Sequence, residues 1–395
     1  MRRTIGGALI AGLAVVHLAG CGGGSGSGSG GGGVSISSIS GPRHMQAGVS
    51  PQGGYVFSAT VSGSSDRSIT WSVSDSSLAT IDASIGVATP SQTNTGVVTI
   101  IATANADSTK QSTLQVNVVD WILAGQVEEM YGLPIGLQVE VINSDGTNPA
   151  TLIPSSVLPE SGYTNCVWAY DHVKFVCSPM FFPGSAPTQL AIFETDGTEG
   201  GTKQTATIDM AQLGFTGIFG NEHFSPDGSK LVFEGGTTGA GGALSAGTYL
   251  VAADGKSAPA LLAPDASGYD AVAGNPRFTP DGTEILYSQE GSVWIMNADG
   301  SNQRQLLAGE SENAEFTPDM KTLFYSSSTG IYRANADGSN AVNIAGPSYT
   351  FEGLSPSGKS ILLVTWAPLG TNNVYTADTD GGNLKLLNGS EWASW

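Results

Sequence analysis

The stretch Phe278-Thr-Pro-Asp-Gly-Thr-Glu-Ile-Leu-Tyr-Ser-Gln-Glu-Gly-Ser-Val-Trp-Ile-Met-Asn-Ala-Asp-Gly300 contains two phrases that recur along the chain. The first is an aromatic residue followed by Thr-Pro-Asp-Gly, and it leads into an apolar run. The second is an alternating strand that ends in Asp299-Gly300. Because proline favours the first corner of a turn and glycine the left-handed corner, each phrase predicts a β-hairpin.

Both phrases repeat at the interval of a propeller blade. Asp-Gly recurs with spacings of 51, 58, 45, 38 and 43 residues, at Asp145-Gly146, Asp196-Gly197, Asp254-Gly255, Asp299-Gly300, Asp337-Gly338 and Asp380-Gly381. The other phrase recurs as Phe224-Ser-Pro-Asp-Gly228, Phe316-Thr-Pro-Asp-Met320 and Leu354-Ser-Pro-Ser-Gly358. Two hairpins per repeat make a four-stranded blade. The sequence therefore predicts six blades.

The two ends of this repeat region complement each other. The first repeat begins near Trp121-Ile-Leu-Ala124 without an opening phrase, and Glu391-Trp-Ala-Ser-Trp395 has the pattern of an opening strand with nothing after it. Pairing these segments would close the ring and remove its open edges. The phrases resemble the TolB-like (WD40-like, PD40) propeller family over about residues 120–395. In the second repeat Trp168-Ala-Tyr-Asp-His172 replaces the motif.

Residues 1–20 have the layout of a signal peptide, with Arg2 and Arg3 before a short apolar stretch. The run Leu18-Ala-Gly-Cys21 resembles the lipobox of bacterial lipoproteins, which implies cleavage before Cys21 and lipidation of its thiol. An ordinary signal peptide or a chance cysteine is the alternative. A glycine follows Cys21, which favours the outer membrane, on its periplasmic side or at the cell surface. Residues 21–33 continue as a Gly/Ser tether.

Residues 34–119 predict a separate β-sandwich. Its expected strands are residues 54–61, 68–73, 78–81, 96–103 and 113–118, which alternate apolar and polar side chains. The segment resembles the group 2 bacterial Ig-like (Big_2) domain. No cysteine lies within it, so Trp71 would pack without an inter-sheet disulfide. Such a domain serves as a spacer or, alternatively, as an adhesive module.

The composition is strongly acidic. Removal of Arg2 and Arg3 with the signal peptide leaves 13 basic against 34 acidic residues, and 30 of these acidic residues follow residue 119. A surface of this charge argues against binding nucleic acid or anionic lipid headgroups. It permits a cationic partner or calcium, and solubility alone is the simpler explanation. We expect a monomer that meets the membrane only through its lipid anchor.

Cys166 and Cys177 are the two cysteines that follow Cys21. If Asp171-His172 forms a two-residue turn, the cysteines lie directly opposite each other as a hydrogen-bonded pair, within disulfide range. Alignment with the Phe224 phrase implies a three-residue loop instead, which would point them to opposite faces. An oxidising envelope favours the disulfide.

Catalytic machinery is sparse in the sequence. His172 and His223 lie in different repeats at different strand positions, which does not predict a metal cluster. No Gly-x-Ser-x-Gly elbow follows the propeller. The Asp-rich turns lack the spacing of a calcium loop and are explained by turn chemistry. We therefore expect no cofactor, no metal and no catalytic residue, although an enzyme is not excluded.

Two patterns suggest binding residues. Phe181, Phe182 and Trp366 lie in long segments expected on the propeller face opposite the Asp-Gly turns. The alternative is that they only cover the blade ends. Four asparagines each stand three residues before the aromatic of their phrase, so their amides could ring the channel beside Glu222 and Glu315: Asn165, Asn221, Asn275 and Asn313. The alternative is that these asparagines cap the strand entry.

The sequence thus favours a non-enzymatic, lipid-anchored envelope protein whose propeller binds a protein, peptide or glycan. A propeller-type lyase or hydrolase acting on glycans or peptides is one alternative. A surface adhesin is another.

Overall fold

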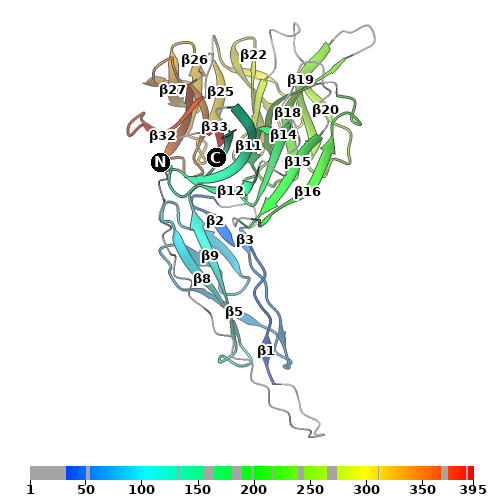
Figure 1. The fold of residues 1–395 in the computed structure, drawn as a ribbon, viewed down its shortest axis with the longest axis vertical. Coiled ribbons are helices and arrows are strands. Elements are labelled where there is room, and N and C mark those ends of the chain that lie inside the picture. Colours follow the sequence, from blue (N-terminus) through cyan, green and yellow to red (C-terminus); the bar gives the residue numbers. More distant parts are fainter. Residues whose placement is uncertain are drawn as a thin grey trace, which may run out of the picture. The chain divides into compact units, whose positions relative to one another are not determined.

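The computed structural model describes residues 33–49, 54–130, 133–154, 163–179, 189–196, 200–215, 217–238, 244–264, 274–309, 311–365, 372–387 and 390–395. Their regular elements are all β-strands, and Val34–Trp395 forms one compact unit (Figure 1). The predicted signal peptide, Cys21 and nearly all of the tether lie outside these residues. In the described part, we find no helix of the length and apolar character that a membrane span requires.

The N-terminal segment is a β-sandwich. One sheet has the order β2-β9-β8-β5, a second has β3-β7-β6, and β1 pairs with β4. Both larger sheets contribute to one core around Trp71, which is buried without a disulfide beside it. The strands are β1 (Ser35–Ile36), β2 (His44–Gln46), β3 (Tyr55–Val56), β4 (Val61–Ser62), β5 (Ile69–Val73), β6 (Ala79–Ile81), β7 (Val87–Pro90), β8 (Gly96–Ala104) and β9 (Gln111–Val119).

The strand predicted over residues 54–61 is wrong as a single element. Its first part is β3, which pairs with β7, and its last part is β4, which pairs with β1. Between them the Phe57 amide donates to the Gly86 carbonyl. The chain therefore changes partners half-way, as strands at the corner of a sandwich do. Two short strands that were not predicted, β1 and β7, supply the partners that this change requires, and a third, β2, pairs with β9.

The rest of the chain forms six four-stranded blades. The first blade consists of β10 (Trp121–Met130), β11 (Leu133–Asn143), β12 (Ala150–Ile153) and β33 (Ser390–Ser394). The second and third consist of β13 (Tyr163–Trp168), β14 (Lys174–Pro179), β15 (Gln189–Thr195), β16 (Thr202–Asp209), β17 (Gly217–Phe224), β18 (Lys230–Thr238), β19 (Leu244–Ala252) and β20 (Ala260–Pro264). The fourth and fifth consist of β21 (Gly274–Phe278), β22 (Glu284–Gln289), β23 (Ser292–Asn297), β24 (Arg304–Leu307), β25 (Ser311–Phe316), β26 (Thr322–Ser327), β27 (Gly330–Asn335) and β28 (Val342–Ala345). The sixth consists of β29 (Thr350–Leu354), β30 (Ser360–Thr365), β31 (Asn373–Asp378) and β32 (Lys385–Leu387).

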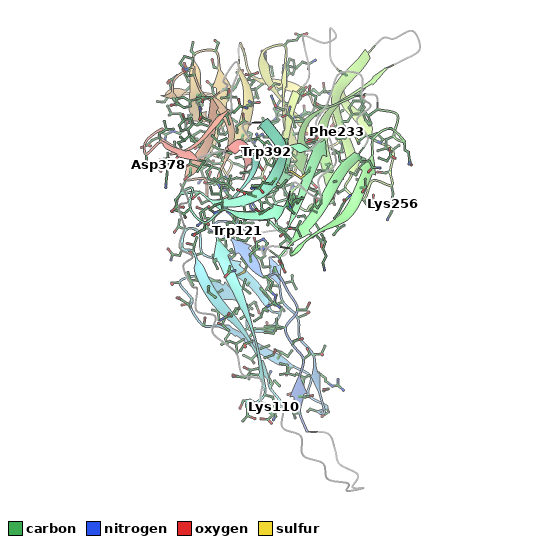
Figure 2. All side chains as sticks on the ribbon, in the orientation of Figure 1. Lys110, Trp121, Phe233, Lys256, Asp378 and Trp392 are labelled. Carbon is green, nitrogen blue, oxygen red and sulfur yellow. A yellow bond between two sulfur atoms is a disulfide. The ribbon has the colours of Figure 1, made fainter. Side chains whose placement is uncertain are left out.

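The C-terminal strand closes the ring, as predicted. β33 pairs antiparallel with β10, and Gly125 lies directly opposite Trp392, which is labelled in Figure 2. The innermost strands contact one another in a closed circle, in the order β33, β13, β17, β21, β25, β29 and back to β33. A first blade built from both ends of the repeat region closes the ring, so each blade packs between two neighbours.

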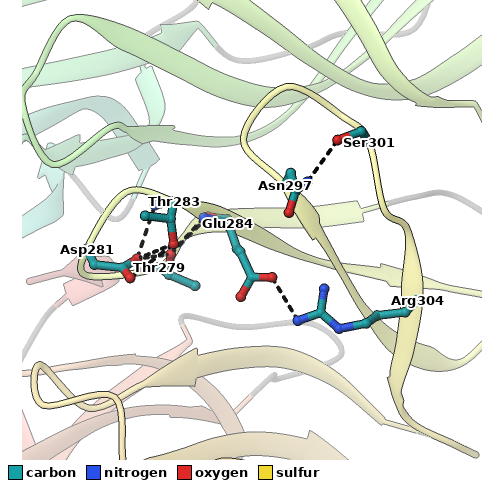
Figure 3. A network of polar contacts seen from close by, with 7 residues as sticks. All are labelled: Thr279, Asp281, Thr283, Glu284, Asn297, Ser301 and Arg304. Carbon is teal, nitrogen blue, oxygen red and sulfur yellow. Dashed lines mark hydrogen bonds and ion pairs between the residues drawn. The ribbon is translucent and has the colours of Figure 1, made fainter.

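The turn between the first and second strands has the same geometry in five blades. In the fourth blade, the Gly282 amide donates to Thr279 O at 2.8 Å, and the Asp281 carboxylate accepts from the hydroxyls of Thr279 and Thr283 (Figure 3). The corner residue has positive φ in each of these turns: His172, Gly228, Gly282, Met320 and Gly358. The second repeat therefore makes the same turn although its motif differs.

The Asp-Gly turns pack blade against blade. Gly300 lies against Leu262 of β20, and a side chain at Gly300 would come within 3.2 Å of that leucine. Gly255 faces Ile208 of β16 in the same way, also at 3.2 Å. Gly146 of the first blade faces Leu387 of the sixth, which continues the pattern across the closure. Asp145, Asp299 and Asp337 also accept hydrogen bonds from the Ser or Thr two residues later, as in Asp299 with Ser301. These turns thus have a structural role between neighbouring blades.

Candidate functional site

A cavity of about 800 Å³ lies where the innermost strands run into the Ser-Pro-Asp-Gly turns. Its wall includes side chains from several blades, among them Asn221, His223, Arg277, Glu315 and Glu352. A cavity of this size, with a few convergent polar groups, is the usual form of a small-ligand site. This channel mouth is therefore the candidate site of the described residues.

One position of the repeat supplies most of these groups. His223, Arg277 and Glu315 each stand immediately before the aromatic residue of their phrase. In the strand, alternate side chains point to opposite faces, so this position faces the channel while the aromatic is buried. The same position is Gly353 in the sixth blade, which leaves room for the side chains of its neighbours.

Arg277 connects three consecutive blades across the channel. Its Nη1 donates to Glu315 Oε2 at 2.5 Å, and its Nη2 donates to the backbone oxygen of Glu352. The Leu354 amide also donates to Glu315 Oε2, at 3.2 Å. A side chain at Gly353 would lie 3.5 Å from both Arg277 and Glu315. The arginine is thus held by the fifth and sixth blades through both of its terminal nitrogens.

Burial dominates the electrostatics of the channel. It raises the pKa of Glu352 to about 7, against a lowering influence from Arg277. It also raises the pKa of Glu315, although the Arg277 charge opposes this. Burial and the Arg277 charge hold the pKa of His223 well below its usual value, so that imidazole is neutral at pH 7. Glu352 thus changes its charge near neutral pH, whereas His223 does not.

A second buried carboxyl group lies behind the channel wall. Glu222 is 1% exposed, its Oε1 has no hydrogen-bond partner, and burial raises its pKa to about 7. Asn221 Nδ2 donates to Glu234 Oε2 at 3.2 Å. Glu222 does not line the cavity.

The four asparagines do not form one ring at the cavity. Asn165 and Asn221 line it, whereas Asn275 and Asn313 are not part of its wall. Asn221, Asn275 and Asn313 have φ values of 61°, 51° and 50°, and the strand register shifts at each of them. Asparagine tolerates this left-handed conformation better than most residues. The recurring asparagine therefore has a local explanation as a bulge residue.

The two cysteines form a disulfide in the structure. Cys166 on β13 is paired in register with Cys177 on β14, and their Cα atoms are 4.1 Å apart. The expectation that the two cysteines occupy a hydrogen-bonded pair of the hairpin is wrong. The Ala169 amide donates to Lys174 O, which closes a four-residue loop and makes positions 166 and 177 a non-hydrogen-bonded pair. The disulfide is fully buried beside the channel wall.

The other predicted sites cannot be compared in this way. Phe181, Phe182 and Trp366 lie outside the described residues, as does Cys21. Among the residues that the structure does describe, no three His, Cys, Asp or Glu side chains gather as a metal site would require.

Sequence reasoning missed Arg277 and Glu352, which form the centre of the site. The available signal was the alternation that places the residue before each aromatic on the channel side. It was obscured because a bulge at the asparagine shifts the register by one residue. Glu352 lies one residue earlier than Arg277 and Glu315 do in their phrases, and only its burial and the Arg277 contact mark it.

Comparison with known proteins supports the propeller fold. TolB from Acinetobacter baumannii is 16% identical over 77% of this chain and 80% of its own, with a TM-score of 0.52. A TolB protein from Agrobacterium tumefaciens is also 16% identical, over 67% of this chain and 88% of its own, with a TM-score of 0.49. No family model and no curated protein matches the sequence. At this identity the likeness shows a shared fold, and the resemblance of residues 34–119 to the Big_2 domain stays a prediction.

Proposed function

We propose that this chain is a lipid-anchored cell-envelope protein whose propeller is a non-enzymatic binding platform for a protein, peptide or glycan. The observation that carries the proposal is a ring closed by its own C-terminal strand around a polar cavity. Such a ring is a rigid scaffold, and binding residues tend to lie on loops that a rigid scaffold holds. The Ig-like segment would serve as a spacer above a lipid on Cys21, with the outer membrane as the favoured location.

The platform is tested by affinity capture from envelope extract with residues 34–395, which form one compact unit. We expect a partner to bind the wild-type fragment and to be lost from a Phe181→Ser/Phe182→Ser variant. The matched control is Leu261→Ser/Leu384→Ser, which removes two exposed leucines from blade edges and should retain the partner. Failure to capture any partner reproducibly, together with hydrolysis of a glycan panel, would overturn the proposal.

The anchor is tested separately in the full chain. Metabolic labelling with an alkyne fatty acid should mark the wild-type protein and place it in the membrane fraction. The Cys21→Ser variant should lose the label and leave that fraction. A labelled or membrane-bound Cys21→Ser protein would contradict the assignment of the anchor.

One observation favours a propeller-type enzyme as a second candidate. Glu352 has a pKa raised to about 7 in a cavity, and general acids often show this combination. The Glu352→Gln variant should then abolish turnover of a glycan or peptide that the wild-type protein cleaves. If the wild-type protein leaves a panel of both classes intact, this candidate is excluded for them.

A further inference from the structure

The cavity at the channel mouth has a surplus of negative charge. Four carboxyl groups and two cationic side chains line it: Asp227, Asp281, Glu315 and Glu352 against Lys230 and Arg277. Asp227, Asp281 and Lys230 are exposed, so the partly buried charged groups are Glu315 and Glu352 against Arg277. The two histidines of the wall have pKa values lowered by burial. Neutral imidazoles do not offset the carboxylates, so the electrostatics of the cavity favour a positively charged ligand.

Arg277 already has two partners in the wall, and its Nε has no hydrogen-bond partner among the described residues. Its Nη1 is bound to Glu315 and its Nη2 to the backbone oxygen of Glu352. A carboxylate or phosphate that displaced Glu315 from Arg277 would leave Glu315 buried without its partner, which is costly. The arginine therefore stabilises the wall, and it neutralises one of the four carboxylates.

Glu352 is the carboxylate that remains for a ligand. It lines the cavity, and its side chain makes no hydrogen bond to another described residue. Glu315, by contrast, accepts from both Arg277 and the Leu354 amide. A half-buried carboxylate without a hydrogen-bond donor of its own is an unmet acceptor, and an ammonium group supplies the donors and the charge that it lacks.

Aromatic side chains complete the wall. Trp168, Tyr170 and Trp395 all line the cavity, from the second blade and from the residue that follows β33. Tyr170 is 36% exposed, so part of its ring is accessible to a ligand, whereas Trp168 is buried and stacked on His172. Aromatic faces attract cations, most strongly when the cation is removed from water. Carboxylate and aromatic groups together are the environment in which proteins hold organic ammonium ions.

We propose that the channel mouth binds an organic ammonium ion, with Glu352 as its counter-charge and the rings of Tyr170 and Trp395 in the same cavity wall. This goes beyond the platform function and does not depend on it. Envelope capture can fail while an amine binds here, and capture can succeed while no amine binds. The two experiments therefore distinguish the proposals.

Titration calorimetry of the full chain with 1,4-diaminobutane tests the site. Butane-1,4-diol and succinate have the same chain length but no charge or the opposite charge, and they should not bind. Glu352→Gln should weaken diamine binding at least tenfold, roughly the effect of one lost charge-assisted hydrogen bond. The matched control is Asp254→Asn, an exposed turn aspartate outside the cavity wall, which should leave the affinity unchanged.

The pH dependence gives a second readout. The diamine stays protonated below pH 9, whereas Glu352 takes up a proton as the pH falls through about 7. Wild-type affinity should therefore fall from pH 8 to pH 5.5, and the Glu352→Gln variant should show a weak affinity that barely changes over this range. Equal binding of the diol, or wild-type affinity in a folded Glu352→Gln variant, would overturn the proposal. If Glu352→Gln does not fold, Glu352→Asp replaces it and should retain the pH dependence at lower affinity.

Discussion

The closing contact between Gly125 and Trp392 leads to a quantitative prediction. The two residues face each other across β10 and β33, and a Cβ atom on Gly125 would overlap the indole ring of Trp392. The backbone of Gly125 is not left-handed, so the Trp392 ring is the only obstacle to an alanine at this position among the described residues. Overpacking of this kind costs about 1–3 kcal/mol, against a gain of about 0.4–1 kcal/mol from the lower entropy of the unfolded chain.

A double-mutant cycle isolates this contact. Gly125→Ala should destabilise the wild-type protein by about 1–2 kcal/mol. In the Trp392→Ala background the ring is gone, so the same substitution should stabilise the protein by about 0.5 kcal/mol. The coupling energy is therefore about 2 kcal/mol, which is large for a single pair. Urea unfolding followed by far-UV circular dichroism measures it without relying on tryptophan fluorescence.

The control is Gly346→Ala, because a side chain there meets no atom within 4 Å. Its effect should stay within about 0.5 kcal/mol in both backgrounds. If Gly125→Ala costs the same with and without Trp392, the indole does not fill the space above the glycine, and the reasoning about the closure fails.

Three further predictions concern the blades. Gly228→Ala should cost about 1–2 kcal/mol, because φ is +68° and nothing lies within 4 Å. Gly381→Ala should cost more in the same chemical denaturation, since its Cβ also meets a backbone carbonyl of the preceding blade. The free energy of unfolding of the Glu222→Gln variant, relative to wild type, should increase by about 3 kcal/mol as the pH rises from 4.5 to 7. The folded state raises the pKa of Glu222, so wild-type stability is full at low pH and is lost as the carboxyl ionises. A difference that does not vary with pH would refute this assignment. The Cys177→Ala variant should lose about 2–3 kcal/mol with its disulfide, and alkylation of two thiols in unreduced, unfolded wild-type protein would contradict the bond.

The blade architecture was predictable because each hairpin is determined by residues that are close together in the sequence. Each hairpin carries its own turn chemistry, and the periodic return of Asp-Gly counts the blades. The closure was predictable for a related reason, since an unpaired opening strand at one end matches a missing one at the other. The His172 turn was harder to recognise, because Trp168-Ala-Tyr-Asp-His172 departs from the motif and the positive φ there is imposed by the hairpin and not by a glycine.

The sandwich shows the limit of local reasoning. Residues 54–61 have the pattern of a single strand, yet this segment exchanges one partner strand for another at Phe57. Which strand a segment pairs with depends on neighbours that are distant in sequence. The register of the two cysteines was also open in the sequence, because it depends on the length of the loop between β13 and β14.

The sequence by itself determined the all-β class, the number of blades and the partner of the last strand, because turn residues and alternation act over a few positions. The tertiary structure decided the candidate site. Arg277, Glu315 and Glu352 come from three blades and are 75 residues apart at most, and the repeat places Arg277 and Glu315 on the channel side without showing that the three residues meet. They converge because the ring brings equivalent positions of every blade to one axis. Their charges and pKa values then follow from burial, which is a property of the closed ring and not of any single repeat.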